Sequence, residues 1–148
     1  TGNWFLRNSQ LAVTLLIAYN RFFTSSGEGA LVDHYKAVYD PKSKGYQAMA
    51  AALSRLSKYT KDKGISVLLV MTPDFHNFTN YPFDFVHGDI KKLSHELGFS
   101  YVDLLPALEN RDAKTLWSMP GDPHPNGLGH ELMAQAIYPA LTTLNTKN

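Results

Sequence analysis

One pattern occurs twice in this chain: an amphipathic helical segment, a closing glycine, and a short apolar segment followed by a polar loop. Gly64 precedes residues 65–71 (ISVLLVM), and Gly98 precedes residues 99–105 (FSYVDLL). Glycine adopts the left-handed conformation that ends many helices, and a continuous aliphatic run is typical of a strand covered on both faces of a parallel sheet. The pattern therefore predicts βαβ units. The apolar positions at helical spacing are Tyr46, Met49, Leu53 and Leu56, then Val86, Ile90, Leu93 and Leu97.

Two further helices are expected at the ends of the chain. Ser9 or Asn8 can cap a helix over residues 10–22, residues 24–30 (TSSGEGA) are expected to form a loop, and a last helix should run from after Asn126 to about Leu144. Only two strands are predicted beside four helices, whereas sheets average about five or six strands. We expect one domain over residues 1–148, the later part of an α/β domain whose first strands precede residue 1.

Composition excludes several classes of function. The 14 Lys and Arg residues nearly balance 13 Asp and Glu residues, so the chain lacks the basic field of a nucleic-acid-binding protein. Without cysteine there are no disulfides, thiolate nucleophiles or cysteine-ligated zinc sites. The apolar run at residues 11–19 (LAVTLLIAY) is too short for a membrane span, which takes about 20 residues, so we expect a buried helix there.

The stretch MPGDPHPNGLGH, residues 119–130, holds the strongest candidate site. A histidine acts as a general base only when its ring is held in the right tautomer, and a nearby carboxylate does this. Asp122 and His124 can form such a pair in a tight loop that Pro123 and Pro125 stiffen. The local alternative is a turn aspartate beside a surface histidine, because Asp, Pro and Gly dominate turns.

The residues after this pair support it structurally. Asn126 is expected to be the N-cap of the last helix, which would fix His124 just before that helix begins. His130, in the first turn, could bond back to the loop and is interpreted as a packed or capping residue. Asp122, His124 and His130 could instead bind a metal, but no further ligand stands at a recognised spacing, so we predict no metal and no cofactor.

Polar residues also follow both predicted strands. Asp74, His76 and Asn77 lie in the loop after residues 65–71, and Asp103 lies near the end of residues 99–105. Ligands bind at this edge of α/β sheets, although loops are polar by default and each of these residues alone has a structural explanation. The aromatic residues of residues 75–85 could line an acyl pocket or form core, and core is expected for at least half of them.

The stretch DPHPNGLGHELMA, residues 122–134, resembles the C-terminal block of SGNH hydrolases, the GDSL-type esterases and lipases. The variant with Asp two residues before His is common in bacterial members. Weaker resemblance extends over most of the chain: residues 40–73 resemble the helix-strand unit before the final block, GFSYVDLLPAL resembles the last strand, and LRNSQLAVTLL resembles an earlier helical stretch.

The resemblance implies a three-layer α/β/α sandwich with a flavodoxin-like parallel sheet that lacks its first strands. It also implies a serine-dependent ester hydrolase in which His124 is the base, Asp122 orients it, and no cofactor takes part. Esters of carbohydrates or of lipids would be the substrates. Related hydrolases are often exported, which favours an exported or periplasmic location over the cytoplasm.

The sequence departs from the family pattern at its start, because no GDS or GxND-like block is present. Ser25 and Ser26 lack a preceding strand that would present a nucleophile. We expect the nucleophile upstream of residue 1, and no hydrolysis by these 148 residues alone. The alternatives are a non-catalytic binding module with a remnant hydrolase fold and an O-acyltransferase; a homodimer through an exposed sheet is also conceivable.

Overall fold

The computed structural model describes residues 9–15 and 28–145, which fall into two compact units, residues 1–34 and 35–148. In the first unit, residues 10–15 are helical, and the Ser9 hydroxyl accepts the Ala12 N–H at 3.2 Å, as expected of an N-cap. Leu11 and Leu15 are exposed, so the expectation of a buried helix is wrong for the described part. The rest of the predicted helix, residues 16–22, lies outside the described residues.

Helix α3 (Glu28–Val38) corrects one prediction. Residues 28–30 were expected to be loop and are the first turn of this helix, while residues 24–27 lie outside the described part. Gly29 suggested a loop, but a single glycine is tolerated in a helix. The helix continues with Tyr35, which stacks on Tyr39 with ring centroids 6.1 Å apart.

Helix α4 (Lys44–Asp62) confirms the helix predicted before Gly64. The Ser43 hydroxyl caps its start by accepting the Tyr46 N–H at 3.1 Å. At its end, Gly64 has a φ of 67°, the left-handed conformation expected at this position.

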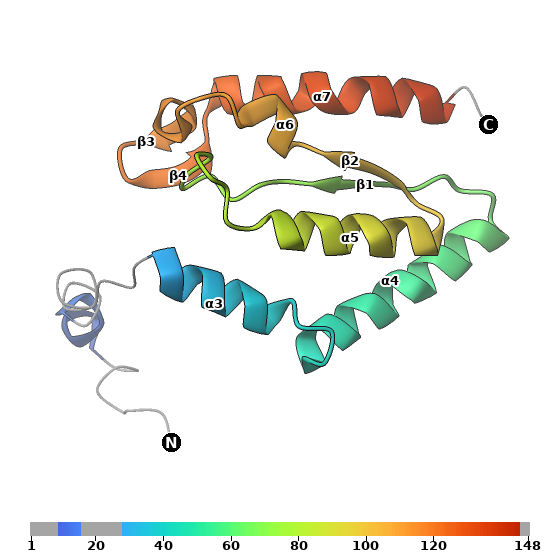
Figure 1. The fold of residues 1–148 in the computed structure, drawn as a ribbon, viewed down its shortest axis with the longest axis horizontal. Helices are drawn as coiled ribbons and strands as arrows, with labels where there is room; N and C mark the ends of the chain where they lie inside the picture. Colours follow the sequence, from blue (N-terminus) through green and yellow to red (C-terminus); the bar gives the residue numbers. More distant parts are fainter. Residues whose placement is uncertain (1–8, 16–27, 146–148) are drawn as a thin grey trace. The chain divides into compact units, whose positions relative to one another are not determined.

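Strands β1 (Leu68–Met71) and β2 (Ser100–Asp103) pair in parallel, with Leu68 opposite Ser100 and Met71 opposite Asp103. Helix α5 (Asp84–Leu97) connects them and ends at Gly98, whose φ is 75°. The predicted βαβ unit is therefore confirmed. Figure 1 shows the two strands between α5 and the last helix, α7 (Gly127–Asn145).

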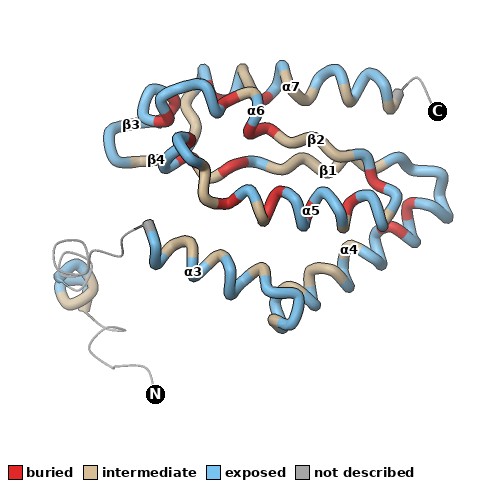
Figure 2. Tube along the Cα trace, in the orientation of Figure 1, coloured by how far each residue is buried: buried red, intermediate tan, exposed pale blue. Residues whose placement is uncertain are grey.

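Both strands are shorter than expected. Ile65 is exposed and precedes the paired residues of β1. At the other strand, Leu105 begins the short helix α6 (Leu105–Leu108), because the Asp103 carboxylate accepts the Leu105 N–H at 3.0 Å. Figure 2 shows β1 as half-buried along its length, which corrects the expectation that residues 65–71 are covered on both faces.

A hairpin replaces the tight loop expected at residues 122–125. After the 3₁₀ helix η1 (Ala113–Leu116), strand β3 (Trp117–Met119) pairs antiparallel with β4 (Asp122–Pro125). Gly121, with a φ of 82°, makes the reversal between the strands. The prolines of β4 are tolerated because each strand of a two-stranded ribbon has an open edge, where a missing N–H costs no ladder bond.

The described residues thus form a mixed α/β fold with a two-stranded parallel sheet and a two-stranded antiparallel sheet. None of their helices combines the length and apolar character that a membrane span requires. The main core gathers residues that follow β1 and β2 together with residues of η1 and α7. Its buried members are Phe75, Phe78, Leu104, Leu105, Leu108, Ala113, Leu116 and Met133.

Candidate functional site

Asp122 and His124 are bonded to each other on β4. Oδ1 of Asp122 accepts the backbone N–H of His124 at 3.1 Å and also contacts Nδ1 of the same residue. Because an ionised carboxylate can only accept, Nδ1 carries the proton in this pair, and Nε2 of the neutral ring keeps a lone pair. The arrangement selects the tautomer that a general base needs.

The pair is open to solvent on the side of the imidazole. The His124 side chain is 83% exposed, and the Asp122 side chain is 35% exposed. The hydrogen bond from the His124 side chain is the main cause that lowers the pKa of Asp122 below its ordinary value, and the bond from the His124 backbone adds to it. The carboxylate is therefore ionised at neutral pH, as an orienting group must be.

Asn126 joins three elements around the pair. Its side-chain oxygen accepts the Gly129 N–H at 3.0 Å, which caps α7, and its amide group donates to the carbonyl oxygens of Thr115 and Trp117 at 3.0 and 3.2 Å. The N-cap prediction is confirmed by this bond. Because Asn126 lies two residues after His124, the same contacts hold that end of β4.

His130 occupies the first turn of α7, where its backbone N–H donates to the Asn126 carbonyl at 3.0 Å. It is exposed, and within residues 9–15 and 28–145 no hydrogen bond of its imidazole is recorded. The expected bond back to the loop is therefore absent from the described structure. His130 is therefore not the packed residue that was expected. It lines a cavity instead.

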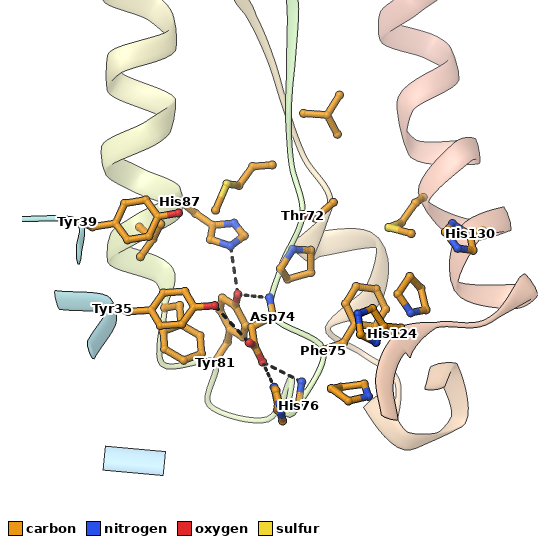
Figure 3. Close-up of a pocket in the computed structure, with 18 residues that line it drawn as sticks. Tyr35, Tyr39, Thr72, Asp74, Phe75, His76, Tyr81, His87, His124 and His130 are labelled. Carbon is orange, nitrogen blue, oxygen red and sulfur yellow. Dashed lines mark hydrogen bonds and ion pairs between the residues drawn. The ribbon is translucent and has the colours of Figure 1, made fainter. Parts of the chain in front are cut away.

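This cavity, of about 580 Å³, lies at the carboxyl end of β1 (Figure 3). Its walls come from the end of α3, the loop after β1, the start of α5, β4 and the first turns of α7. Four histidines and three tyrosines line it, so its chemistry is that of imidazole and aromatic groups. These residues are His76, His87, His124, His130, Tyr35, Tyr39 and Tyr81.

The aromatic loop after β1 divides between core and cavity. Phe75, Phe78 and Phe83 are buried, which agrees with the expectation of core residues, and Phe75 and Phe83 also line the cavity beside Tyr81. The Trp117 indole N–H donates to the Phe75 carbonyl at 2.7 Å. This bond ties the hairpin that carries His124 to the loop after β1.

That loop carries a second pair of the same kind. Oδ1 of Asp74 accepts the backbone N–H of His76 at 2.9 Å and lies 2.7 Å from Nδ1 of His76. The sequence analysis placed both residues in this loop but did not pair them. The signal was present in the Asp-X-His spacing that DFH shares with DPH.

A partly buried chain of hydrogen bonds supports the loop, and the sequence reasoning missed it. Oδ1 of Asp103 lies 2.8 Å from Nδ1 of His87, and Nε2 of His87 lies 3.3 Å from the Tyr81 hydroxyl. The Tyr81 oxygen in turn accepts the Asp74 N–H at 2.7 Å. Burial raises the pKa of the Tyr81 hydroxyl, so it stays protonated and donates to His87. His87 lies within an apolar helical stripe, where nothing in its spacing distinguishes it.

Neither a cluster of metal ligands nor a serine accompanies the histidines of the cavity among the described residues. Nowhere in them do three His, Asp or Glu residues gather closely enough to bind a metal ion. No serine is among the described residues that line the cavity. Comparisons of the chain with protein-family models, with curated proteins and with solved structures found no match.

Proposed function

We propose that the protein is a serine-dependent ester hydrolase in which His124 is the general base and Asp122 orients it. The observation that carries the proposal is the pair of hydrogen bonds that the Asp122 carboxylate accepts from the backbone and the ring of His124. It leaves Nε2 free to accept a proton, and His124 lines the neighbouring cavity. The resemblance of residues 122–134 to the final block of SGNH hydrolases supports the same roles.

The reaction needs one proton to move twice. Nε2 of His124 takes the proton of a serine hydroxyl while the serine oxygen bonds to the ester carbonyl carbon. The imidazolium, stabilised by Asp122, then gives that proton to the departing alkoxy oxygen. Water repeats the two steps on the acyl-serine, which releases the acid and restores the serine.

The proposal includes a fold larger than the described sheet. A parallel strand pair between α5 and α7 is the arrangement that a three-layer α/β/α sandwich repeats across its sheet. Further strands and the nucleophilic serine, in a GDS motif, are expected in polypeptide that precedes residue 1. An ester of a carbohydrate or of a lipid is the proposed substrate, and no cofactor is required.

The test uses the protein as its gene encodes it. We expect turnover of p-nitrophenyl acetate and labelling of one serine by a fluorophosphonate, located by mass spectrometry of the peptides. His124→Ala should lower kcat/KM by roughly 10⁴-fold, since removing a triad member costs about this much. His95→Ala is the matched control, because His95 is exposed on α5 and does not line the cavity.

Two outcomes would refute the proposal. Undiminished hydrolysis by the His124→Ala variant would show that this imidazole is not the base. Absence of both turnover and serine labelling in the wild-type protein would favour a binding module that lacks esterase activity.

A further inference from the structure

The Asp74–His76 pair repeats the geometry of the Asp122–His124 pair. In each, one carboxylate oxygen accepts the backbone N–H and contacts Nδ1 of the histidine two residues later. The His76 side chain is 58% exposed, and Nε2 has no partner among the described residues. Two imidazoles with the same tautomer therefore line one cavity.

The second pair is held more firmly than the first. The Asp74 side chain is 13% exposed, against 35% for Asp122. Its Oδ2 lies 3.4 Å from the Tyr35 hydroxyl, and its backbone N–H is bonded to Tyr81, the end of the partly buried chain from Asp103. A side chain held on several sides is preorganised, so it loses little freedom when a ligand binds.

The surroundings of His76 indicate what kind of ligand it meets. His76 lines the cavity that holds His124 and also a neighbouring depression of about 660 Å³. Apart from Ala113, the other residues that line this depression are polar or charged: Asn77, Thr79, Glu109, Asn110, Arg111, Asp112 and Lys114. A ligand that extends from His124 past His76 therefore enters a polar surface, where an alkyl chain would leave hydrogen-bonding groups without partners.

A hydrogen bond connects the loop that carries His76 with the hairpin that carries His124. Phe75, the residue between Asp74 and His76, accepts a hydrogen bond from the Trp117 indole at 2.7 Å, and Trp117 lies opposite Pro125 in the hairpin. This hydrogen bond connects the segments that carry His76 and His124, and Figure 3 shows both histidines among the residues that line the cavity. Both rings also line the same cavity, as contact with a single ligand requires.

We propose that His76 is a substrate-binding residue whose Nε2 accepts a hydrogen bond from a hydroxyl group of the ester, so that the substrate is an ester of a polyhydroxy alcohol such as a carbohydrate. This inference rests on the proposed hydrolase function and selects among its substrates. Asp74 is a positioning residue, because it acts by fixing the tautomer and direction of the His76 ring.

The experiment compares two acetyl esters of three-carbon alcohols with the protein as encoded. Glycerol monoacetate carries two hydroxyl groups, and propyl acetate carries none. His76→Phe keeps a planar ring but removes the acceptor nitrogen, so kcat/KM should fall about five- to tenfold for glycerol monoacetate, the loss expected for one neutral hydrogen bond. It should stay within about twofold for propyl acetate, and His76→Gln, with an amide oxygen near the Nε2 position, should recover part of the loss.

A binding measurement separates this inference from the hydrolase proposal. In NMR spectra of the same protein, methyl glucoside should shift the ring nitrogen signals of His76 in a saturable way, and the His95 signals should stay unchanged. An equal loss for both esters, or no saturable shift, would overturn the inference. If neither ester is hydrolysed but the shift is seen, the hydrolase proposal fails while His76 remains a hydroxyl-binding residue.

Discussion

Nδ1 of His87 lies 2.8 Å from Oδ1 of Asp103, so a buried side chain of α5 is bonded to the last residue of β2. The same carboxylate oxygen accepts the Leu105 N–H at 3.0 Å, at the start of α6. Three elements therefore meet at one atom at the carboxyl end of the parallel sheet. The loop that carries Asp74 depends on this junction through Tyr81.

Removal of the Asp103 carboxylate should destabilise the protein. Asp103→Ala leaves the buried His87 N–H without an acceptor, which typically costs about 1–3 kcal/mol of unfolding free energy. Asp103→Asn should cost less, because its amide oxygen can still accept. Urea unfolding followed by circular dichroism measures both, and equal stability of Asp103→Ala and wild type would contradict the role assigned to the junction.

Gly129 allows α7 to approach the strand that carries His124. A Cβ at this position would lie 3.0 Å from Cβ of Pro125 and 3.7 Å from the Phe75 ring, whereas a Cβ at Gly127 meets nothing within 4 Å. Gly129→Ala should displace Pro125 and with it His124, and a shift of about 1 Å in a reacting group can cost about 100-fold in rate. We therefore expect esterase kcat/KM of the encoded protein to fall about ten- to 100-fold in Gly129→Ala.

Gly127→Ala is the matched control for that substitution. Both glycines lie in the first turn of α7, but only the one at 129 faces the hairpin. The control should keep its rate within about twofold, since the added methyl group contacts nothing. Equal rates in the two variants would show that the close approach at Gly129 does not position the strand that carries His124.

The ionisation of Asp122 should report its bond to His124. The pKa of this carboxyl lies below its ordinary value of 3.8, chiefly through the hydrogen bond from the His124 ring. Because the folded pKa lies below the unfolded one, the stabilisation is present above the ordinary value and is lost as pH falls through the folded pKa. NMR titration of the carboxyl carbon should therefore give a midpoint below 3.8 in wild type.

His124→Ala should move that midpoint upward without restoring the ordinary value completely. The substitution removes the ring bond but keeps the backbone N–H of residue 124, and the Ser118 hydroxyl also lowers the pKa of Asp122. An unchanged midpoint in the variant would mean that the ring does not donate to the carboxylate in solution.

Much of the architecture around the site could be predicted from the sequence. The apolar spacing and closing glycines gave α4, α5, the parallel pair and the start of α7, because each depends on short-range periodicity and on backbone conformations that glycine favours. The separation of two residues allowed the Asp122–His124 contact, although a turn aspartate beside a surface histidine remained the local alternative. Local chemistry was sufficient for the helices and the parallel pair.

What could not be predicted depends on contacts between distant segments. His87 meets Asp103 across 16 residues, and Trp117 meets Phe75 across 42 residues, so neither contact leaves a local pattern. The hairpin at residues 117–125 was mistaken for a loop, because two prolines within four residues suggest irregular backbone. One reason why helix α3 was not predicted is that Gly29 lies in its first turn.

Asn126 should contribute to stability through both ends of its amide group. Asn126→Ala removes the α7 cap and the two bonds to the carbonyl oxygens of Thr115 and Trp117, so we expect a loss of about 2 kcal/mol in unfolding free energy. Ser43→Ala removes the cap of α4 alone and should cost about 1 kcal/mol. Thermal and urea unfolding compare the two, and an equal loss would mean that the Thr115 and Trp117 contacts add nothing.

The three Asp–His pairs among the described residues share one orientation, with Nδ1 against the carboxylate in every case. Because Nδ1 is occupied in each pair, the exposure of the ring decides how readily Nε2 reacts with an acylating electrophile such as diethyl pyrocarbonate. The exposed rings of His124 and His76 present only Nε2 to the reagent, whereas His87 is buried and its Nε2 faces Tyr81. Modification of His76 and His124 with His87 left unmodified would thus test this arrangement independently of any enzymatic turnover.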